Sequence, residues 1–462
     1  MIQLNVSDVL RECLGTLICG SEDLVLGHFS NDTRTIQEQD VYIGIRGESF
    51  DGNDFYLEAL KKGASCCILD RFDIESFPKD FEMRTIIVVE NTIEAIQKLA
   101  TYKRSKLQIP VVAVTGSAGK TSTKDMIASV LQKKYTVFKT PGNLNGQIGL
   151  PLSILELQDE EVLVLEMGMN DFGQIAKLTQ IAKPSMAVIT NIGTAHIGIL
   201  KSQENILKAK LEILEGMEPG STLIINGDDP LLSFIQLPNY DVKRCTIKKQ
   251  GDYQASNLTI QDEVSHYHVT MLNEEFDVLL PVMGQAFVMD SILAIAVANQ
   301  LEVSASLIQK GLKEFQLSGN RMEVIHHHGL TILNDTYNSN YEALIQALDI
   351  LKKYEGTRKI AVLGSVLELN EYASKIHYDI GMIPNLKSVD YLFLCGSYMT
   401  DLQQGAIANG MNPEQILSFE KKQDLEQALI EMLQMGDVLL VKASHGMHFE
   451  TIVEKIKESY LV

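Results

Sequence analysis

The segment at residues 110–126, PVVAVTGSAGKTSTKDM, constrains the fold of this chain more than any other part of it. An apolar run at residues 111–115 leads into a loop at residues 116–121 that is rich in glycine and other small residues. A segment with the apolar spacing of a helix follows the loop. This order predicts a β-strand, a tight loop and a helix. In such a unit the N–H groups of the loop and the positive end of the helix face the same ligand.

The residues of this loop favour a polyphosphate as that ligand. Gly116 and Gly119 allow the backbone to turn tightly and to direct its N–H groups inward. In loops of this kind the lysine, here Lys120, reaches the outer phosphates, and a hydroxyl, that of Thr121 or Ser122, binds Mg²⁺. The loop is shorter than the general pattern, because valine stands at the position of its first glycine. An ordinary tight turn is therefore the alternative to nucleotide binding.

Length and composition set broad limits on the class of protein. The chain has 462 residues, enough for about three domains, and hydrophobic residues make up 45% of it. Its formal net charge of −20 argues against nucleic acid as a partner, because a phosphate backbone binds basic surfaces. The first residues do not resemble a signal peptide, and no apolar run approaches the ~20 residues of a membrane span. The six cysteines lack metal-ligand spacing, so we expect reduced thiols in a cytoplasmic protein without membrane insertion.

Alternating apolar strands and helical patterns predict an α/β fold with three domains, at residues 1–106, 107–317 and 318–462. The first is a small α/β unit. The second carries the glycine-rich loop and has mostly parallel strands, because its apolar runs are continuous. Within it, the alternating pattern of residues 240–282 predicts antiparallel hairpins. The third again alternates strand and helix, as in a Rossmann-like domain. The polar stretch at residues 103–108 is predicted to be the linker between the first two domains.

Two polar residues near the ends of predicted strands are candidate ligands for magnesium. Glu166 ends the predicted strand VLVLE, and a carboxylate at a strand end could hold Mg²⁺ directly or through water. The alternative is a solvated acid. His196 belongs to the segment TNIGTAH after another strand, and it could bind metal or orient a phosphate. The alternative there is a structural histidine.

A lysine on the apolar face of a helix is a further candidate. A helix is predicted at residues 202–217, with Ser202 as its cap. Ile206, Lys210 and Ile213 are spaced so that they share one face. Lys210 therefore points where apolar side chains point, and an inward lysine needs a partner or a changed pKa. A lysine whose stem is buried while its amine reaches water is the alternative.

The third predicted domain also places polar residues near strand ends. Asp335 lies in the segment NDTYNSN, which follows a strand and opens a helix. Arg321 lies near the junction of the second and third domains, where it could touch a phosphate across a cleft. Lys442 ends the strand DVLLVK. Residues 326–328 are three histidines, which we interpret as an exposed edge or turn because consecutive side chains cannot all face one metal.

These motifs, in this order, resemble those of the Mur ligase family, and the resemblance spans nearly the whole chain. Two segments, Tyr337-Asn338 and Leu367-Glu368-Leu369, look most like the members that use D-alanyl-D-alanine. The other segments that carry the resemblance are Asp32-Thr33-Arg34, Gly47 to Gly52, the glycine-rich loop with Lys124-Asp125-Met126, Gly142 to Asn145 with Ile148 to Pro151, Leu165 to Met169, Asn191 to His196, Lys208 to Glu212, Asp335, Leu363-Gly364 and Lys442-Ala443-Ser444.

The resemblance implies an ATP-dependent, ADP-forming amide ligase of peptidoglycan precursor synthesis. It implies a first domain that binds a uridine nucleotide, a central ATP-binding domain and a C-terminal ligase domain. The carboxylate of UDP-N-acetylmuramoyl-tripeptide would attack the γ-phosphate of ATP, and the amine of D-alanyl-D-alanine would then attack the acyl phosphate. ATP and Mg²⁺ are the implied cofactors, and we expect a monomer.

The resemblance also implies a set of site residues. Lys210 would be carbamoylated, which turns its amine into a carboxylate ligand for a second Mg²⁺. Arg321 would meet a phosphate and Asp335 the nucleotide. The catalytic set is Lys120, Glu166, His196 and Lys210, the metal ligands are Thr121, Glu166, His196 and Lys210, and the nucleotide contacts are Thr115, Gly116, Ser117, Ala118, Gly119, Lys120, Thr121, Ser122, Arg321 and Asp335.

Several positions depart from the family pattern. The segment that usually contacts adenosine carries Ala286, Phe287 and Asp290 instead of histidine and asparagine. The remaining departures are Ser365 for aspartate, Tyr341 for proline, His445 for arginine and Asn53 for histidine. They leave two alternatives open: a divergent ligase with a different amine substrate, and an inactive homologue that only binds the UDP-peptide.

Overall fold

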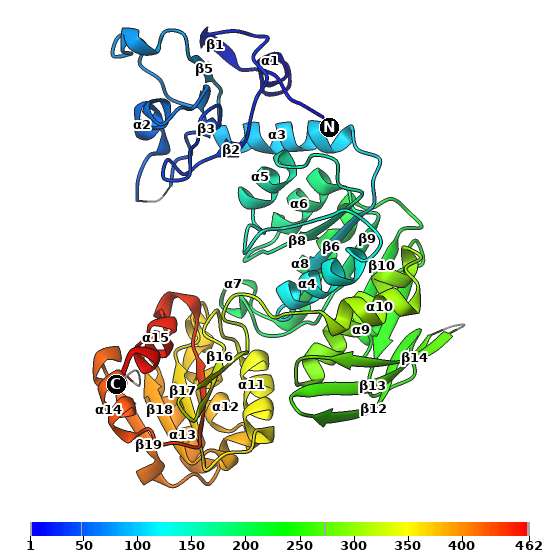
Figure 1. The fold of residues 1–462 in the computed structure, drawn as a ribbon, viewed down its shortest axis with the longest axis vertical. Helices are drawn as coiled ribbons and strands as arrows, with labels where there is room; N and C mark the ends of the chain where they lie inside the picture. The colour runs from blue at the N-terminus through cyan, green and yellow to red at the C-terminus, as the bar shows by residue number, and fades with distance from the viewer. Residues whose placement is uncertain (1, 48, 272–273, 460–462) are drawn as a thin grey trace.

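The structure is a computed structural model, and it describes residues 2–47, 49–271 and 274–459. Figure 1 shows three lobes that follow one another along the chain, each built around its own β-sheet. We call them the N-terminal, central and C-terminal units. The α/β fold class predicted from the sequence is confirmed, with three sheets whose strands are mostly parallel.

The N-terminal unit contains a five-stranded sheet in the order β1-β5-β4-β3-β2. Only β1 runs antiparallel to its neighbour within this sheet. Cys66 and Cys67 lie in β4 and are fully buried, as their position in an apolar run predicts. The elements are α1 (Val6–Cys13), β1 (Thr16–Cys19), β2 (Phe29–Ser30), β3 (Val41–Ile43), α2 (Tyr56–Lys61), β4 (Cys66–Leu69), β5 (Thr85–Val88) and α3 (Thr92–Ser105).

The predicted linker at residues 103–108 is wrong in its first half, because α3 continues to Ser105. The end of this helix lies against the central unit (Figure 1), and its two cations bind carbonyl oxygens there. Lys103 is buried and donates to the Leu155 carbonyl at 2.5 Å, while Arg104 donates to the Ala182 carbonyl at 2.7 Å. In the sequence these charged residues look like a solvated linker. Their hydrogen-bond partners are carbonyl groups at the ends of helices in another unit, which the neighbouring residues in the sequence do not indicate.

The central unit contains a nine-stranded sheet in the order β14-β13-β12-β11-β10-β9-β6-β8-β7. Strands β6 to β11 pair in parallel, while β12, β13 and β14 form the predicted antiparallel hairpins. The prediction missed that β11 pairs in parallel with β10. The strands are β6 (Val111–Thr115), β7 (Val137–Lys139), β8 (Val162–Glu166), β9 (Met186–Ile189), β10 (Thr222–Asn226), β11 (Asp241–Thr246), β12 (Tyr253–Gln261), β13 (Val264–Met271) and β14 (Glu274–Leu280).

Helices cover both faces of the parallel part of this sheet, which is why β6, β8 and β9 are continuous buried runs. Helix α4 packs beside α9, and these two carry residues of the site described below. The helices are α4 (Lys120–Leu131), α5 (Gly149–Leu155), α6 (Gln174–Ala182), α7 (Ile197–Leu200), α8 (Gln203–Leu211), α9 (Gln285–Gln300) and α10 (Ala305–Lys313).

The C-terminal unit contains a six-stranded sheet in the order β15-β16-β20-β17-β18-β19. Only the edge strand β15 is antiparallel to its neighbour, and it ends at His327, so the histidine run is the exposed edge and turn that we predicted. The elements are β15 (Glu323–His327), β16 (Leu330–Asn334), α11 (Tyr341–Lys353), β17 (Arg358–Gly364), α12 (Ala373–Gly381), β18 (Tyr391–Cys395), α13 (Met399–Ala408), β19 (Ile416–Phe419), α14 (Lys422–Met432), β20 (Asp437–Lys442) and α15 (Glu450–Ser459).

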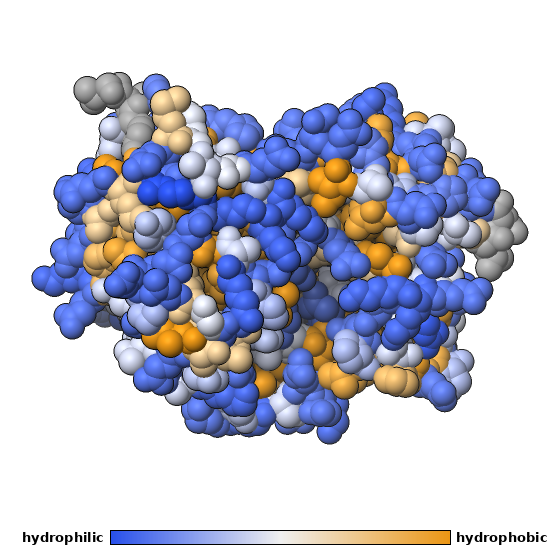
Figure 2. Space-filling view, turned by 90° about the horizontal axis from the view of Figure 1, so that it is seen from below, coloured by the Kyte–Doolittle hydropathy of each residue, from blue (hydrophilic) through white to orange (hydrophobic). Residues whose placement is uncertain are grey.

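Figure 2 shows one face, on which hydrophilic side chains surround small, scattered apolar patches. Within the described parts of the chain, no helix combines the length and the apolar character that crossing a membrane requires.

Candidate active site

A cavity of about 1170 Å³ lies between the central and C-terminal units, and residues from both line it. Most of the residues predicted from the sequence meet there. Ser117 to Ser122, Glu166, His196, Lys210, Arg321 and Asp335 all line this cavity. Thr115 and Gly116 do not: Thr115 is fully buried in β6, and its hydroxyl lacks a hydrogen-bond partner.

The glycines of the loop between β6 and α4 are required by its backbone. Gly116 has φ +153°, and a Cβ there would lie 1.8 Å from the Thr190 hydroxyl. Gly119 caps α4 with φ +79°, in the left-handed region, and a Cβ there would lie 2.7 Å from a carboxylate oxygen of Asp290. The tight turn predicted from the two glycines is therefore present, and it leads directly into the N-terminus of α4.

The segment after β9 holds this loop in place. The Ala118 N–H donates to Asn191 Oδ1 at 3.0 Å, and Asn191 Nδ2 donates to the Ala118 carbonyl at 3.1 Å. The Ser117 hydroxyl accepts the Gly193 N–H at 2.8 Å. The same segment continues to His196, so the loop and this histidine share one support.

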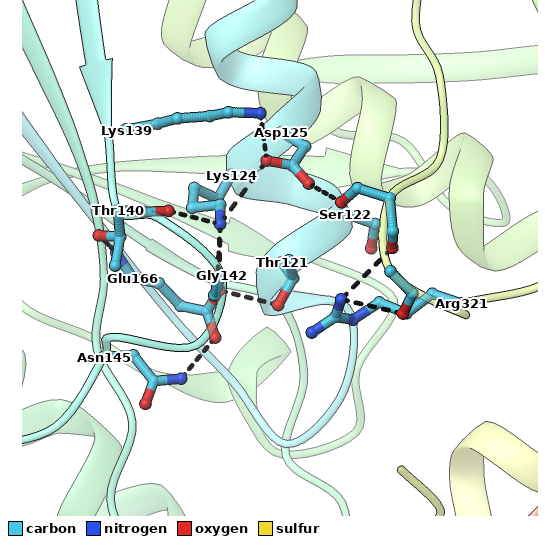
Figure 3. A network of polar contacts seen from close by, with 12 residues as sticks. Thr121, Ser122, Lys124, Asp125, Lys139, Thr140, Gly142, Asn145, Glu166 and Arg321 are labelled. Carbon is cyan, nitrogen blue, oxygen red and sulfur yellow. Dashed lines mark hydrogen bonds and ion pairs between the residues drawn. The ribbon is translucent and has the colours of Figure 1, made fainter. Parts of the chain in front are cut away.

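Thr121 at the start of α4 faces Glu166 at the end of β8 (Figure 3), and Lys120 directly precedes Thr121. The amine of Lys120 folds back onto the loop and donates to the Gly116 carbonyl at 3.0 Å. The Thr121 hydroxyl donates to one oxygen of Glu166 at 2.8 Å, and Asn145 Nδ2 donates to the other at 2.7 Å. Burial lowers the pKa of Lys120, whereas the charge of Glu166 raises it.

Lys124 is a residue whose role at the site we did not predict. It lies one turn after Lys120 on α4, is almost fully buried, and donates to the Thr140 carbonyl at 2.9 Å. Its amine lies 3.8 Å from Glu166 and 3.6 Å from Asp125 (Figure 3). A buried cation therefore lies next to Glu166, the candidate metal ligand. The i, i+4 spacing of Lys120 and Lys124 places both side chains on the same side of α4, and this spacing could have indicated from the sequence that Lys124 belongs to the site.

His196 faces an acid of the C-terminal unit. Its Nδ1 lies 2.9 Å from Glu368, but the two groups are not aligned as a hydrogen bond. His196 has φ +64°, so its backbone is in the left-handed region at the start of α7. Its interaction with Glu368 lowers the pKa of that carboxyl.

Lys210 is the inward lysine that the helical pattern predicts. It is 2% exposed, and Ile206 and Ile213 on the same face are fully buried. The helix α8 ends at Leu211, earlier than predicted, and a 3₁₀ turn at Glu212–Gly216 follows. No described residue forms a hydrogen bond or ion pair with the Lys210 amine. Burial holds the pKa of Lys210 well below its ordinary value, and the charge of Lys120 acts in the same direction.

These residues fit a divalent cation in their chemistry. Glu166 offers a carboxylate, Thr121 a hydroxyl and His196 a ring nitrogen without an aligned hydrogen bond. The described residues contain no cluster of three histidine, cysteine or acidic side chains that could hold a metal by itself. A complete site would therefore need a further anionic ligand, and the Lys210 amine, which lines the same cavity, is a group that a chemical modification could turn into one.

Arg321 and Asp335 enter the cavity from the C-terminal unit. The Arg321 guanidinium stacks on the Tyr337 ring, 3.5 Å from its centre. Asp335 pairs with Lys442 at 2.5 Å and accepts the Met322 N–H at 3.1 Å. Lys442 ends β20, as predicted, and it is buried.

Comparison with known proteins identifies the family. Residues 114–298 match the Mur ligase middle domain, and residues 320–445 match the Mur ligase glutamate ligase domain. The UDP-N-acetylmuramoyl-tripeptide–D-alanyl-D-alanine ligase of Bacillus subtilis (strain 168) is 35% identical over 470 residues, with 100% of both chains covered. The enzyme of that name from Synechocystis is 34% identical, with 98% of this chain and 96% of the relative covered.

This chain belongs to the Mur ligase family.

Solved structures of the family have the same fold. A crystal structure of MurF from Acinetobacter baumannii matches with a TM-score of 0.88 and 25% identity, covering 99% of each chain. MurF ligase from Thermotoga maritima, in complex with ADP, matches with a TM-score of 0.82 and 29% identity, covering 94% of this chain and 97% of that one. The three-domain Mur ligase fold and the use of ATP by this chain follow from these comparisons.

The departures from the Mur ligase pattern separate into two groups. Ala286, Phe287, Asp290 and His445 lie in the lining of the cavity, although Asp290 is buried. The other three make internal contacts. Ser365 donates to the Ser397 carbonyl at 2.9 Å, Asn53 binds Asp51 and Asp70, and Tyr341 opens α11 and packs against the core of the C-terminal unit.

We call residues 116–121, which join β6 to the start of α4, the phosphate loop of this Mur ligase, and Asp290 is a buried acid beside it. It accepts a hydrogen bond from the Ser122 hydroxyl at 2.5 Å, and burial raises its pKa from 3.8 to about 7. The unfolded chain releases this proton above pH 3.8, whereas the folded chain keeps it until about pH 7. Folding stability therefore falls as the pH rises through this window.

We expect the Asp290→Asn variant to gain stability over the parent as the pH rises. With magnesium and nucleotide removed, the advantage should grow by roughly 3 kcal/mol between pH 5 and pH 8, because asparagine does not ionise. Urea unfolding followed by far-UV circular dichroism suits this chain, which lacks tryptophan. A difference between the two proteins that does not change with pH would contradict the assignment.

Proposed function

We propose that this chain joins D-alanyl-D-alanine to UDP-N-acetylmuramoyl-tripeptide at the expense of ATP, as a step of peptidoglycan precursor synthesis. The names of its full-length relatives support this substrate pair. The observation that carries the proposal is the meeting of Lys120, Glu166 and Lys210 on one cavity that Arg321 enters from the C-terminal unit.

The reaction proceeds in two steps. The terminal carboxylate of the tripeptide attacks the γ-phosphorus of ATP, which releases ADP and forms an acyl phosphate. The amine of D-alanyl-D-alanine then attacks the acyl carbon and expels inorganic phosphate. Negative charge spreads over the transferring phosphoryl group, so loop N–H groups, Lys120 and Arg321 stabilise it electrostatically. The nucleotide would lie along residues 117–122, which line the cavity, and meet Asp335 of the C-terminal unit.

Magnesium is the second part of the proposal. When bound, it neutralises phosphate charge and polarises the γ-phosphoryl group. Thr121, Glu166 and His196 would supply ligand atoms, and a carbamate on Lys210 would supply the missing anion. Carbamate formation requires an uncharged amine to attack CO₂. The lowered pKa of Lys210 and the absence of a partner among the described residues both favour that reaction.

The units have separate tasks in this proposal. Residues 1–106 form the domain that holds the uridine nucleotide, residues 107–317 the ATP-binding domain, and residues 318–462 the ligase domain. We propose that the protein acts as a cytoplasmic monomer.

A panel of amines tests the function. Release of ADP is measured with ATP, Mg²⁺, the UDP-muramoyl-tripeptide and either D-alanyl-D-alanine or another dipeptide, and the product mass is determined. We expect D-alanyl-D-alanine to give the highest kcat/KM. Failure of D-alanyl-D-alanine while another amine reacts would overturn the assigned substrate but keep the ligase.

The alternative function is that of a related ligase with a different amine substrate. It applies if another amine reacts and D-alanyl-D-alanine does not. His445 favours it, because this residue stands where arginine is usual in the family and lines the cavity, with its ring centre 5.5 Å from that of Tyr337. The other alternative, a protein that binds the UDP-peptide without catalysis, is tested by a single turnover. Substrate-dependent ADP release that Lys120→Ala abolishes would eliminate it.

A further inference from the structure

Two segments of the C-terminal unit hold one loop of the central unit, the segment at residues 193–201. The start of α11 contacts one end of that loop. The residues around Glu368 contact the other: Asn370 Nδ2 donates to the Gly198 carbonyl at 3.0 Å, and the Tyr372 hydroxyl donates to the Lys201 carbonyl at 2.8 Å. Figure 1 shows α7, which belongs to this loop, beside the C-terminal unit. The loop carries His196, so its position depends on a separate folding unit.

Glu342 makes the contact at the α11 end. One carboxylate oxygen accepts the Thr194 N–H at 2.9 Å, and the other accepts the Thr194 hydroxyl at 3.1 Å. The approach is close, since a Cβ on Gly193 would lie 2.5 Å from the Glu342 carboxyl carbon. Within the described residues, no lysine, arginine or histidine forms an ion pair with Glu342, so Thr194 is the partner that fixes its orientation.

The same contact region reaches the phosphate loop. Asn340, which caps α11, donates to the Ser117 carbonyl at 3.2 Å. The Ser117 hydroxyl in turn accepts the Gly193 N–H at 2.8 Å. The first turn of α11 thus contacts the phosphate loop and the loop before His196 at once. Helix α11 begins in the segment that also carries Asp335 and Tyr337, which line the cavity.

We propose that Glu342 is a positioning residue that makes docking of the C-terminal unit a condition for the active arrangement of residues 193–196. Its carboxylate binds both hydrogen-bond donors of Thr194. This contact fixes the position of His196 and of the segment before it, which supports the phosphate loop. The inference rests on the proposed ligase function and adds Glu342 to the residues on which that function depends. Glu342 acts through Thr194 and need not touch the reacting atoms.

A double-mutant cycle tests the proposal. Steady-state rates are measured for Glu342→Ala, Glu342→Gln, Thr194→Val and the double variant Glu342→Ala/Thr194→Val. The matched control is Glu355→Ala, an exposed acid beyond the end of α11. We expect Glu342→Ala to lower kcat 10-fold to 100-fold while the KM values for ATP and the tripeptide change less than about 3-fold. Glu342→Gln should recover most of the rate, because its amide oxygen still accepts the Thr194 N–H.

The double variant decides between coupling and a merely structural role. If Glu342 acts through Thr194, adding Thr194→Val to Glu342→Ala costs no further rate. If the losses in kcat of the two single variants multiply in the double variant, the proposal is overturned. A kcat for Glu342→Ala equal to that of Glu355→Ala would also overturn it. If Glu342→Ala does not fold, Thr194→Val alone must show a lowered kcat at an unchanged KM. Absence of ligase activity in the parent protein would instead refute the proposed function.

Discussion

Replacing Lys120 with alanine is expected to reduce ligase activity by at least about 100-fold and to weaken ATP binding. Its amine lies in the loop between β6 and α4, where it now donates to the Gly116 carbonyl at 3.0 Å. A phosphate oxygen would be a stronger acceptor, since hydrogen bonds between two charged groups are roughly twice as strong as neutral ones. Removing a single group that stabilises transition-state charge costs about 10²–10³ in kcat. Isothermal titration with ATP and steady-state kinetics measure the two effects.

Lys133→Ala is the matched control for this variant. Lys133 follows the end of the same helix and pairs with Glu314 at 2.5 Å, away from the cavity. We expect it to bind ATP and to turn over like the parent. An unchanged ATP affinity in Lys120→Ala would contradict the assignment of this loop to phosphate.

Lys210→Ala is expected to lose activity to a similar degree and to recover part of it when a short carboxylate such as acetate is added. The physical reason is that the missing group is an anionic ligand, and a small carboxylate can enter the space that the buried side chain leaves. Activity is measured against acetate concentration, with chloride at equal ionic strength as the salt control. Lys208→Ala, an exposed lysine of the same helix, should need no rescue.

The rescue separates two roles for Lys210. If the lysine acts as a cation, added carboxylate will not restore activity and a short alkylamine will. That outcome would contradict carbamoylation while leaving Lys210 essential. Rescue by carboxylate alone would support an anionic ligand beside Glu166.

Local sequence patterns were sufficient to predict the elements that carry the site. The apolar run before Gly116 is β6 as predicted, and Glu166 ends β8, so the carboxyl ends of adjacent parallel strands bring these residues together. The helical spacing of Ile206, Lys210 and Ile213 also predicted correctly that this lysine is buried. In each of these cases the periodicity of a single element decides where the side chain points.

Interactions between units could not be predicted in the same way. Glu342 looks like an ordinary acid in the first turn of a helix, and only the fold places Thr194 against it. Lys103 looks like part of a polar linker, although its partner is a carbonyl oxygen 52 residues away in the sequence. Such partners are set by the packing of separate sheets, about which the local pattern of hydrophobic residues carries no information.

The central claim is that ATP bound on the loop between β6 and α4 phosphorylates the tripeptide carboxylate. Measuring the transfer of oxygen from that carboxylate to phosphate tests this claim most directly. The tripeptide is labelled with ¹⁸O in its terminal carboxylate, and the inorganic phosphate released during ligation with D-alanyl-D-alanine is analysed by mass spectrometry. An acyl phosphate leaves one carboxylate oxygen on phosphorus, so the account predicts one ¹⁸O in each phosphate released. Phosphate without ¹⁸O, formed while the amide product accumulates, would contradict it.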